Sequence, residues 1–467
     1  MEFKTALTVQ ELKHMQKYCI NDAQSLYESL SEYKKMIEQE LHIDILNKLT
    51  LPALSLSAFK RKVELNHINM YAYQFFRKGY VGGISDIYKP YGKNLVKLDV
   101  NGLYPYVMAK HKYGYGKLYR SNKIDDLYEF CQKYHGFLYV KIECSKSLRL
   151  PLICIKKDER NIQGYGNFEA VVYSKEILYC LENYPQYYQF QALHAEYYKE
   201  SRYLFKDFIE EMYKIKQKYE GNKSRLIKLI MNSLYGRLGI DIDKPETLVS
   251  TDITEIFEII NQHEKIENVY ENDEFYHITY IDENVDNRLS KMYRLNARPD
   301  LAAAITSEAR MYMQELKEKV EVYYTDTDSL IIKEEEMAKI DEYLNDKELG
   351  KLKIEGYYQQ GLFIAPKSYI LEDYEHNYEI KMKGMKKEEL DVYDKGELFQ
   401  LLYAKSINQA DPFQFTFTRS IEFFKNWKEL KISNRKININ TYPEFNKRDK
   451  VYNEKQQWVD TWPKKIN

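Results

Sequence analysis

The sequence predicts an α+β fold, in which helices and strands alternate irregularly along one chain. Apolar residues recur at helical spacing over 8–42 and again over 300–318. Residues 94–100 form a short apolar run, and residues 137–145 alternate between apolar and polar, as buried and half-buried strands do. Residues 320–333 read as two apolar strands that meet at a polar tip, which predicts a hairpin. This order of elements favours an α+β core.

The remaining segments are weaker in pattern. Two helical segments, 204–219 and 223–235, are expected to be separated by Glu220-Gly221-Asn222. Residues 240–296 mix acidic loops with short strands, and the tail from about 390 onward is mixed and basic. Because no repeat, low-complexity block or Pro/Gly/Ser-rich linker interrupts the chain, we expect one continuous globular unit.

Composition excludes several classes of protein. The 467 residues are 44% hydrophobic, which is ample for packed cores and, by length, for roughly two to four domains. No apolar run approaches the ~20 residues of a membrane span, and the start at Met1 lacks a secretory signal. We therefore expect a soluble intracellular protein with no membrane partner. The five cysteines form no CxxC pair, so we expect reduced structural thiols and no zinc site.

Charge and tyrosine content leave nucleic-acid binding open. The formal net charge of −1 argues against a protein that coats nucleic acid, but it allows a locally basic groove. Tyrosine is abundant, at 45 residues. An AT-rich coding sequence would explain this, and rings for stacking on bases are the alternative.

The hairpin tip carries the sharpest chemical signal. Asp326 and Asp328 stand two residues apart between apolar strands, where two acids repel each other and lose solvation. A divalent cation would remove that penalty, and Mg²⁺ prefers oxygen ligands that it shares with substrate phosphates. A solvated turn is the alternative, since Asp is common in turns.

A third carboxylate closes the apolar run at 94–100. Asp99 is followed by Asn101-Gly102, after which residues 105–109 resume a helical pattern. Asp99 is either a metal ligand at the mouth of a sheet or a residue that caps the helix or turn.

Lysines mark the helical arms. Lys228, Asn232 and Tyr235 share one helix face by their spacing, and Gly236 is expected to end that helix. Lys216 lies on the preceding arm, so two antiparallel arms would bring both lysines to one triphosphate. Each lysine taken alone is equally consistent with an ordinary solvated side chain.

Taken together, these segments resemble the motifs of family B DNA polymerases. Residues 99–105 resemble motif A (DxxSLYP), residues 228–236 match motif B (KxxxNSxYG), and residues 324–329 match motif C (YxDTDS), in the order of the family. Residues 367–369 match the KxY motif. Residues 80–83 resemble the YxGG motif of the protein-primed branch, which serves linear phages and linear plasmids.

The chain departs from the family in two places. Gly102 stands where motif A usually has Ser, which leaves the metal ligand untouched. Tyr18 and Asp22 resemble the YxxxD motif that closes the 3′–5′ exonuclease domain, but only 17 residues precede Tyr18 and they contain no DxE. We therefore expect that this chain does not build an exonuclease site by itself, and that Tyr18 and Asp22 are structural.

The resemblance implies a right-hand polymerase with palm, fingers, thumb and two family-specific insertions. The expected segments are 1–60 (remnant of the exonuclease region), 61–110 (template-contact segment and motif A part of the palm), 111–200 (first insertion and palm), 201–239 (fingers), 240–296 (second insertion), 297–389 (palm with motif C and KxY) and 390–467 (thumb and C-terminal region).

The resemblance also implies roles for single residues. Asp99, Asp328 and Asp326 would be catalytic, with two Mg²⁺ ions (Mn²⁺ able to substitute) held by Asp99, Asp328 and the carbonyl of Val100. The expected nucleotide-binding residues are Tyr104, Lys216, Lys228, Asn232 and Tyr235. The expected DNA-binding residues are Tyr80, Gly82, Gly83, Ser233, Gly236, Thr325, Lys367 and Tyr369.

The function so implied is template-directed nucleotidyl transfer from dNTP to a primer hydroxyl, protein-primed and strand-displacing, without its own exonuclease. The expected partners are primer and template DNA and dNTP, with a terminal protein primer and a separate exonuclease chain as open additions. The expected location is the cytoplasm of a bacterium or phage-infected host, or an organelle or cytoplasm that carries a linear plasmid.

Three alternatives remain open at this stage. A primer-independent or RNA-directed polymerase would use the same palm, although Thr327 separates the two acids that reverse transcriptases place side by side. A non-catalytic nucleic-acid-binding remnant would explain the missing exonuclease motifs. A metal-dependent nuclease would leave the lysine helix unexplained.

Overall fold

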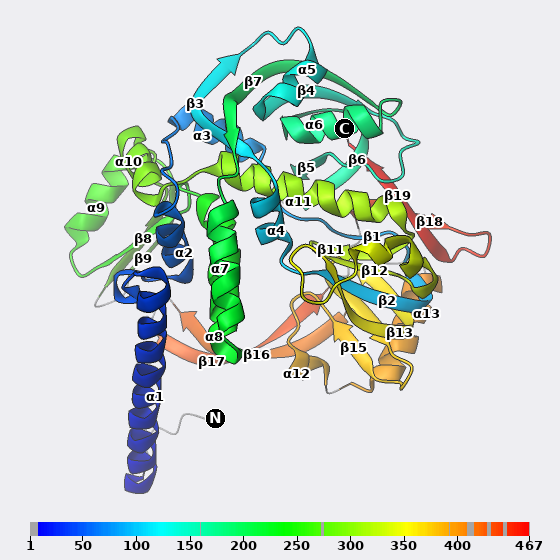
Figure 1. The fold of residues 1–467 in the computed structure, drawn as a ribbon. Coiled ribbons are helices and arrows are strands. Elements are labelled where there is room, and N and C mark those ends of the chain that lie inside the picture. Colours follow the sequence, from blue (N-terminus) through cyan, green and yellow to red (C-terminus); the bar gives the residue numbers. More distant parts are fainter. Residues whose placement is uncertain are drawn as a thin grey trace. The chain divides into compact units, whose positions relative to one another are not determined.

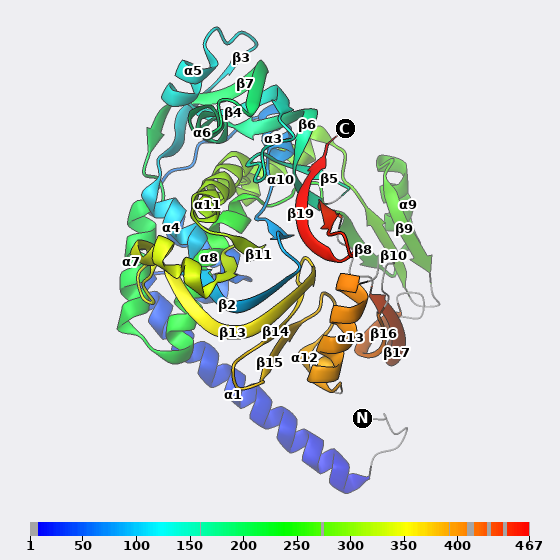
Figure 2. The ribbon, with the colours of Figure 1, turned by 90° about the vertical axis from the view of Figure 1, so that its right-hand side faces the viewer.

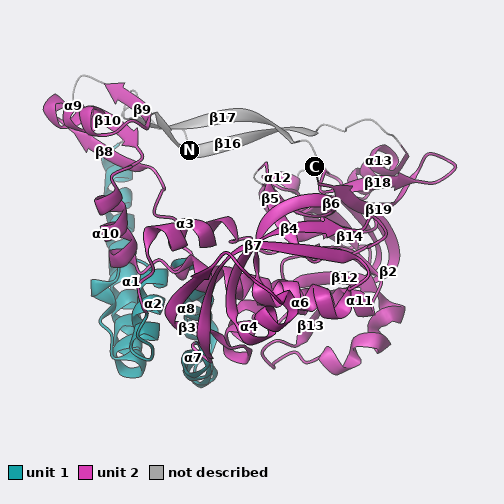
Figure 3. Ribbon diagram, turned by 90° about the horizontal axis from the view of Figure 1, so that it is seen from above, with its two compact units in different colours: residues 1–65, 205–237 teal, residues 66–204, 238–467 magenta. Residues whose placement is uncertain are grey.

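The chain folds into two compact units rather than the single continuous unit expected from its sequence. Unit 1 consists of Met1–Leu65 and Phe205–Arg237, and unit 2 consists of Asn66–Leu204 and Leu238–Asn467 (Figure 3). The computed structural model describes residues 8–158, 160–271, 275–391, 393–408, 415–426, 431–441 and 446–466. No linker of special composition marks the points where the chain passes between units, so composition could not predict them.

Unit 1 is helical. Its described elements are α1 (Val9–Leu41), a short 3-10 helix (Ile45–Asn47), α2 (Leu51–Lys60), α7 (Lys206–Lys218) and α8 (Gly221–Leu238), whose last residue belongs to unit 2. α1 is one long helix, and it begins with a capping box between Thr8 and Glu11. α7 ends at Lys218 and α8 begins at Gly221, which corrects the break expected at Glu220-Gly221-Asn222.

A seven-stranded antiparallel sheet in unit 2 carries the predicted carboxylates (Figure 1). In spatial order its strands are β1 (Ser85–Ile87), β11 (Val322–Asp326), β12 (Ser329–Lys333), β2 (Tyr91–Val100), β13 (Leu352–Ala365), β14 (Ser368–Glu372) and β15 (Tyr378–Lys381). The strand expected at 94–100 is confirmed as part of β2, and the hairpin expected at 320–333 is confirmed as β11 and β12. β2 lies between β12 and β13, and Leu95 and Val96, which point to opposite faces of the strand, are both fully buried.

Apolar side chains cover both faces of this sheet. On one face, Leu95, Tyr324 and Phe363 belong to a buried cluster that includes Trp458. On the other face, alternate residues of β13 and β14 pack against helices α12 (Lys387–Leu390) and α13 (Lys395–Asn408). Figure 2 shows these two helices beside β14 and β15.

A second sheet in unit 2 contains the residues of the predicted first insertion. Its strands, in order, are β18 (Arg448–Tyr452), β19 (Trp458–Lys465), β6 (Arg160–Tyr173), β4 (His135–Cys144), β7 (Tyr188–Arg202) and β3 (Tyr113–Ser121), with β5 (Cys154–Lys157) paired to β6. β4 confirms the strand expected at 137–145. Helices α5 (Leu127–Lys133) and α6 (Ser174–Asn183) pack against each other beside this sheet.

The predicted second insertion contains helices as well as strands. Strands β8 (Glu246–Ser250), β10 (Tyr276–Tyr280) and β9 (Ile266–Glu271) form a sheet with α9 (Ile253–Gln262), and α10 (Val285–Leu295) follows. The short strands expected here are confirmed, whereas the two helices were not expected. Asp252 and Asn284 cap α9 and α10 with their side chains, and these start signals were present in the sequence.

The remaining described elements are α3 (Met70–Lys78), α4 (Leu103–Lys110), α11 (Pro299–Lys319), a 3-10 segment (Glu334–Tyr343) and the antiparallel pair β16 (Phe415–Asn426) and β17 (Lys431–Thr441). Among all the described residues, no helix is both long enough and apolar enough to cross a bilayer. All five cysteines are free thiols, as expected.

Helix α11 confirms the helix expected at 300–318 and is buried along most of its length. It packs against α3, α4 and α6. Two buried ion pairs involve this helix. Arg298, which precedes its first residue, contacts Asp300 at 2.6 Å, and Asp300 also accepts a 2.9 Å hydrogen bond from Tyr198. Arg310 contacts Glu176 of α6 at 2.9 Å. These pairs tie α11 to the second sheet and to α6.

Replacing Asp300 with alanine should destabilise unit 2 strongly. The substitution leaves the guanidinium of Arg298, which is 6% exposed, without its carboxylate. We expect a loss of about 3–5 kcal/mol in the free energy of unfolding, measured by urea denaturation. Asp125→Ala is the matched control, because its pair with Lys123 is exposed and should contribute less than about 1 kcal/mol. Equal effects of the two substitutions would contradict this account.

Candidate active site

The site begins at the end of β2, where motif A turns from strand into helix. Asp99 pairs across the sheet with Ser329 on one side and Lys353 on the other. Gly102 precedes α4 and has a φ of +60°, in the left-handed region that favours glycine. A Cβ there would also lie 3.0 Å from Leu349. The backbone conformation at position 102 and the nearby Leu349 therefore both favour glycine over the serine that the family usually has there.

Motif C forms the turn between β11 and β12. Asp326 is the last residue of β11, and Thr327 and Asp328 make the turn. Thr327 has a φ of +62°, and its N–H donates to the Ile84 carbonyl at 2.7 Å. A β-branched residue in this region is strained. The bond to Ile84 therefore helps to hold the turn in place.

Backbone pairing brings motif A and motif C together. The Val100 N–H donates to the Asp328 carbonyl at 2.8 Å, and Asp99 faces Ser329 in register. Asp99 and Asp328 are both partly exposed. Asp99 and Asp328 are far apart in the sequence. In the fold, Asp99 near the end of β2 and Asp328 in the turn before β12 therefore lie at the same end of the sheet.

Asp326 differs from the other two acids. Its Oδ1 atom is buried without a hydrogen-bond partner, and the nearest cation among the described residues is Lys367, whose Nζ lies 3.9 Å away. Lys367 belongs to the turn between β13 and β14, and its N–H donates to the hydroxyl of Tyr324 at 2.9 Å. The KxY lysine and the first acid of motif C are thus neighbours.

The residues at this sheet end fit a divalent metal of the Mg²⁺ type. Among the described residues, no group of three or more His, Cys, Asp or Glu side chains is arranged to hold an ion. Two carboxylates with a backbone carbonyl leave positions for water and phosphate oxygens, as Mg²⁺ sites do. The unsatisfied oxygen of Asp326 adds negative potential beside them.

The YxGG segment lies directly against motif C. A Cβ on Gly83 would come within 2.6 Å of the Thr327 side chain, so only glycine fits there. Asn161 donates to the Gly83 carbonyl at 3.1 Å, and Arg310 donates to the Gly82 carbonyl at 3.2 Å. Tyr80 precedes these glycines and stacks beneath the guanidinium of Arg77. Buried polar groups therefore hold this loop in place.

Tyr104 of motif A reaches the same place. A small cavity of about 10 Å³ is lined by Gly83, Tyr104, Thr325 and Thr327, among others. Thr325 is 2% exposed, and its hydroxyl donates to the Ser329 carbonyl. The structure thus brings the three motifs together but buries Thr325 beneath the surface.

Tyr369 of the KxY motif is also buried, at 2% exposure. Its hydroxyl donates to Glu379 of β15 at 3.0 Å, and Glu379 also accepts bonds from Lys97 and Tyr358, each at 2.6 Å. Burial alone would raise the pKa of Glu379, but these bonds outweigh it and hold that pKa below its ordinary value. The hydroxyl of Tyr369 therefore faces the protein interior.

The lysine arms belong to unit 1. Lys216 lies on α7 and Lys228 on α8, and burial, together with the ammonium of Lys228, lowers the pKa of Lys216. Lys228 is exposed, and the side-chain oxygen of Asn232, one turn further along α8, is buried without a hydrogen-bond partner. Two neighbouring ammonium groups form a local site for an anion.

The other residues of motif B also lie on α8. The hydroxyl of Ser233 donates to the Leu229 carbonyl at 2.6 Å, and Tyr235 is partly exposed. Gly236 lies inside α8, so the expectation that it ends the helix is wrong. The apolar face continues to the fully buried Leu238, and its burial outweighs the ~1 kcal/mol cost of a helical glycine.

Sequence reasoning missed three residues of this region. Lys97, Glu379 and Arg310 hold Tyr369 and the glycine loop, but none of them belongs to a recognised motif. Lys97 could have been noticed, since it is a lone charge inside an apolar strand. Glu379 could not, because its partners come from three other strands.

Comparisons with known structures define the fold. Phi29 DNA polymerase, in its ternary complex with primer-template DNA and nucleotide, matches with a TM-score of 0.65 at 17% identity, over 94% of this chain and 73% of that one. Its complex with primer-template DNA alone matches equally well. The fold is therefore that of a right-hand polymerase, as the sequence predicted.

Residues 3–322 match the family model described as DNA polymerase type B, organellar and viral. The chain belongs to this family, which confirms the resemblance read from its motifs. Polymerases of the family generally use divalent metal ions.

Several relatives are named as DNA polymerases. A probable DNA polymerase of Podospora anserina is 26% identical over 96% of this chain and 38% of its own length. One from Ascobolus immersus is 29% identical over 80% of this chain and 31% of its own length. The DNA polymerase of Bacillus phage Nf is 27% identical over 46% of this chain and 41% of its own length. The chain thus spans about a third of the length of the fungal relatives.

Replacing Glu379 with glutamine should destabilise the seven-stranded sheet that ends in β15, because it leaves Lys97 without its hydrogen-bonded carboxylate partner. The substitution removes the negative charge opposite an ammonium group that is 11% exposed. We expect a loss of about 2–4 kcal/mol in the free energy of unfolding, measured by urea denaturation. The double variant Lys97→Met/Glu379→Gln should recover much of that loss because no unpaired charge remains. If the loss in the free energy of unfolding of the double variant equals the sum of the losses of the two single variants, the ion pair between Lys97 and Glu379 is contradicted.

Proposed function

We propose that this chain is a template-directed DNA polymerase that transfers nucleotides from dNTP to a primer hydroxyl. The observation that carries the proposal is the pairing of β2 with β12, which sets Asp99 and Asp328 side by side at one end of the palm sheet. Family membership and the fold support it. No side chain with a nucleophilic role is needed, so positioning and charge neutralisation would supply the rate.

Asp99, Asp328 and the carbonyl of Val100 would hold two Mg²⁺ ions, for which Mn²⁺ could substitute. When bound, such ions lower the pKa of the attacking hydroxyl and stabilise the leaving pyrophosphate. Asp326 would act beside them. Its carboxylate, 3.9 Å from the Lys367 ammonium, would orient that lysine toward the primer strand.

Five residues would select the nucleotide. Lys216 and Lys228 would neutralise the triphosphate, and the effect of the Lys228 ammonium on the pKa of Lys216 supports that role. Asn232 and Tyr235, further along α8, would face the same nucleotide. Tyr104 would lie under the sugar and exclude a 2′-hydroxyl by contact, which its place beside motif C supports.

The DNA would be held by backbone and lysine contacts. Tyr80, Gly82 and Gly83 would contact the template, since glycines let backbone N–H groups approach phosphates closely. Lys367 would contact the primer directly. Ser233, Thr325 and Tyr369 would support these contacts from within the fold, because their side chains are buried or bonded internally. Gly236 is exposed on α8 and would contact the DNA itself.

The finer proposals follow the protein-primed branch. The fingers would be residues 201–239, the insertions would lie at 111–200 and 240–296, and the thumb at 390–467, part of which is outside the described residues. The primer would be the hydroxyl of a terminal protein, and the insertions would support strand displacement. The site of action would be a phage-infected bacterium or a compartment with a linear plasmid.

The decisive test is extension of a primed template with all four dNTPs and Mg²⁺. We expect Asp328→Ala to lower the extension rate by at least about 10²–10³-fold, because it removes a carboxylate that would hold the metal ions, and those ions stabilise the negative charge that develops in the reaction. Asp346→Ala is the matched control, because that acid is exposed on a loop of the same unit. Extension by Asp328→Ala at the rate of the control would overturn the assignment of Asp328.

The same assay reports on the other expectations. Extension from an unprimed template would favour a primer-independent enzyme, and shortening of the unextended primer would show that the expectation of a missing exonuclease is wrong. If the wild type binds primer-template DNA but does not extend the primer, the chain is a DNA-binding protein rather than an enzyme.

Replacing Tyr104 with valine should admit ribonucleotides. The smaller side chain removes the contact proposed to exclude the 2′-hydroxyl. We expect the ratio of rNTP to dNTP incorporation to rise by about tenfold or more, measured as kcat/KM for single additions. Tyr106→Val, on the same helix, serves as the control. Unchanged discrimination by Tyr104→Val would remove Tyr104 from this role.

A further inference from the structure

A cluster of rings and lysines lies on the first insertion, away from the motifs described above. It is formed by three lysines and three tyrosines of β3, α5 and β7, and by the loop that follows α5. We call it the tyrosine–lysine patch, and its members are Lys117, Tyr119, Lys133, Tyr134, Tyr197 and Lys199. Figures 1 and 2 show β3 and β7 side by side, with α5 next to them.

Strand pairing and ring contacts hold the patch together. Tyr119 and Tyr197 face each other across β3 and β7, with ring centroids 5.9 Å apart. The Tyr134 ring centroid lies 4.9 Å from that of Tyr197. All three rings are partly exposed. A row of partly exposed, mutually packed rings is a rigid surface on which a further flat ring can stack.

Lysines cover these rings. The ammonium of Lys199 lies 4.4 Å from the Tyr119 ring centroid, and that of Lys117 lies 5.4 Å from it. Lys133 is placed in the same way over Tyr134, at 5.4 Å. Three cation–ring pairs therefore lie within one patch.

The charges of the patch are not neutralised by acids. Among the described residues, no carboxylate lies within 4 Å of the ammonium groups of Lys117, Lys133 or Lys199, and all three lysines are exposed. The neighbouring arginines behave differently, since Arg120 is paired with Glu196 and Arg202 with Glu200. In a chain whose net charge is −1, the patch is a local excess of positive charge next to open aromatic faces.

We propose that the tyrosine–lysine patch binds single-stranded DNA. The lysines would leave the rings to neutralise phosphates, and the uncovered tyrosines would stack on bases. Base stacking on aromatic side chains combined with lysine contacts is the means by which proteins hold single strands without regard to sequence. Duplex DNA would not use the rings, because its bases are already stacked.

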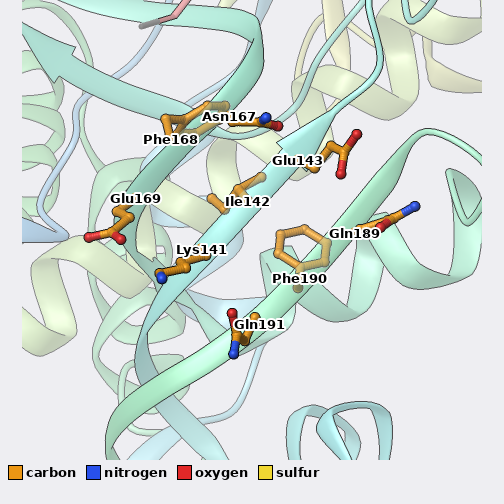
Figure 4. A pocket seen from close by; sticks show the side chains of 9 residues that line it. All are labelled: Lys141, Ile142, Glu143, Asn167, Phe168, Glu169, Gln189, Phe190 and Gln191. Carbon is orange, nitrogen blue, oxygen red and sulfur yellow. The ribbon is translucent and has the colours of Figure 1, made fainter.

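A groove elsewhere on the same sheet shows the contrast. The groove of about 450 Å³ in Figure 4 lies across β4, β6 and β7 and carries the carboxylates of Glu143 and Glu169 beside a single lysine, Lys141. Two acids against one base would repel a polyphosphate. The groove on the same sheet is therefore an unsuitable site for DNA, and Lys141 is a suitable control position.

The patch would be reached by single-stranded DNA close to the primer terminus. β3 begins three residues after α4, the helix that carries Tyr104 of motif A, so the patch and the carboxylates belong to the same unit. The inference rests on the proposed function. The single strand would be either the template ahead of the primer terminus or the strand displaced from it, and the experiment below separates these two sources.

The test compares binding to three DNA hairpins of the same primed stem, measured by fluorescence anisotropy without dNTP. One hairpin has no tail, one has a single-stranded template tail of about 15 nucleotides, and one has a displaced tail of the same length. We expect the wild type to bind one tailed hairpin about tenfold more tightly than the untailed one. The tail that gives this gain identifies the source of the strand.

Two variants should abolish the gain without changing affinity for the untailed hairpin. Lys117→Ser/Lys199→Ser removes the charges and should lower the salt dependence of tail binding by about 1.4 in the log–log slope. Tyr119→Leu removes the stacking face and keeps apolar bulk. The matched control Lys141→Ser/Lys156→Ser makes the same change of charge on exposed strand positions of the same sheet and should keep the gain.

Three outcomes would overturn the proposal. They are no gain from either tail in the wild type, an equal loss on tailed and untailed hairpins, and a loss in the lysine variant that Tyr119→Leu does not share. The last outcome would indicate a surface for polyanions or for an acidic protein. Asp328→Ala should retain the gain, so failure of catalysis and failure of the patch are distinguishable.

Discussion

The pairing of β2 with β12 is the constraint on which the rest of the structure depends. It places Asp99 opposite Ser329 and joins Val100 to Asp328 by a backbone hydrogen bond of 2.8 Å. Because side chains alternate along a strand, a slip of one residue would turn Asp99 to the other face of the sheet. The buried residues of β2, such as Leu95 and Leu98, oppose that slip, so the hydrophobic core fixes the geometry of the acids.

Around this pairing, the backbone is bent into unusual conformations and then held there. Gly102, Thr327 and Lys367 all have positive φ, and each lies in a turn next to the carboxylates. Thr327 is secured by the Ile84 carbonyl and Lys367 by the Tyr324 hydroxyl. Strain of this kind persists only where the surroundings over-determine it, and it is common at functional sites. The polar groups that support the site, including Glu379 beneath Tyr369, are therefore part of its design.

The sequence predicts the parts of this fold that are encoded locally. Apolar runs predicted β2 and the β11–β12 hairpin, and the break near Gly221 predicted that Lys216 and Lys228 would lie on two separate helices. The parts that depend on distant partners were not predictable. Nothing near Tyr369 in the sequence shows that its hydroxyl is bonded to Glu379, and a glycine at 236 suggests a helix end until the burial of Leu238 is known. The capping residues Asp252 and Asn284 are local signals for the starts of α9 and α10, so these two helices are encoded locally as well.

The central claim is that Asp99 and Asp328 hold one metal centre, and iron-directed cleavage of the backbone tests it most directly. Fe²⁺ bound in place of Mg²⁺, with ascorbate and peroxide, cuts the polypeptide near the ion, and the fragments can be mapped by mass spectrometry. The account predicts two cuts, one near Asp99 and one near Asp328, both suppressed by excess Mg²⁺. Cuts at only one of these positions, or at neither while other acidic segments are cut, would contradict it.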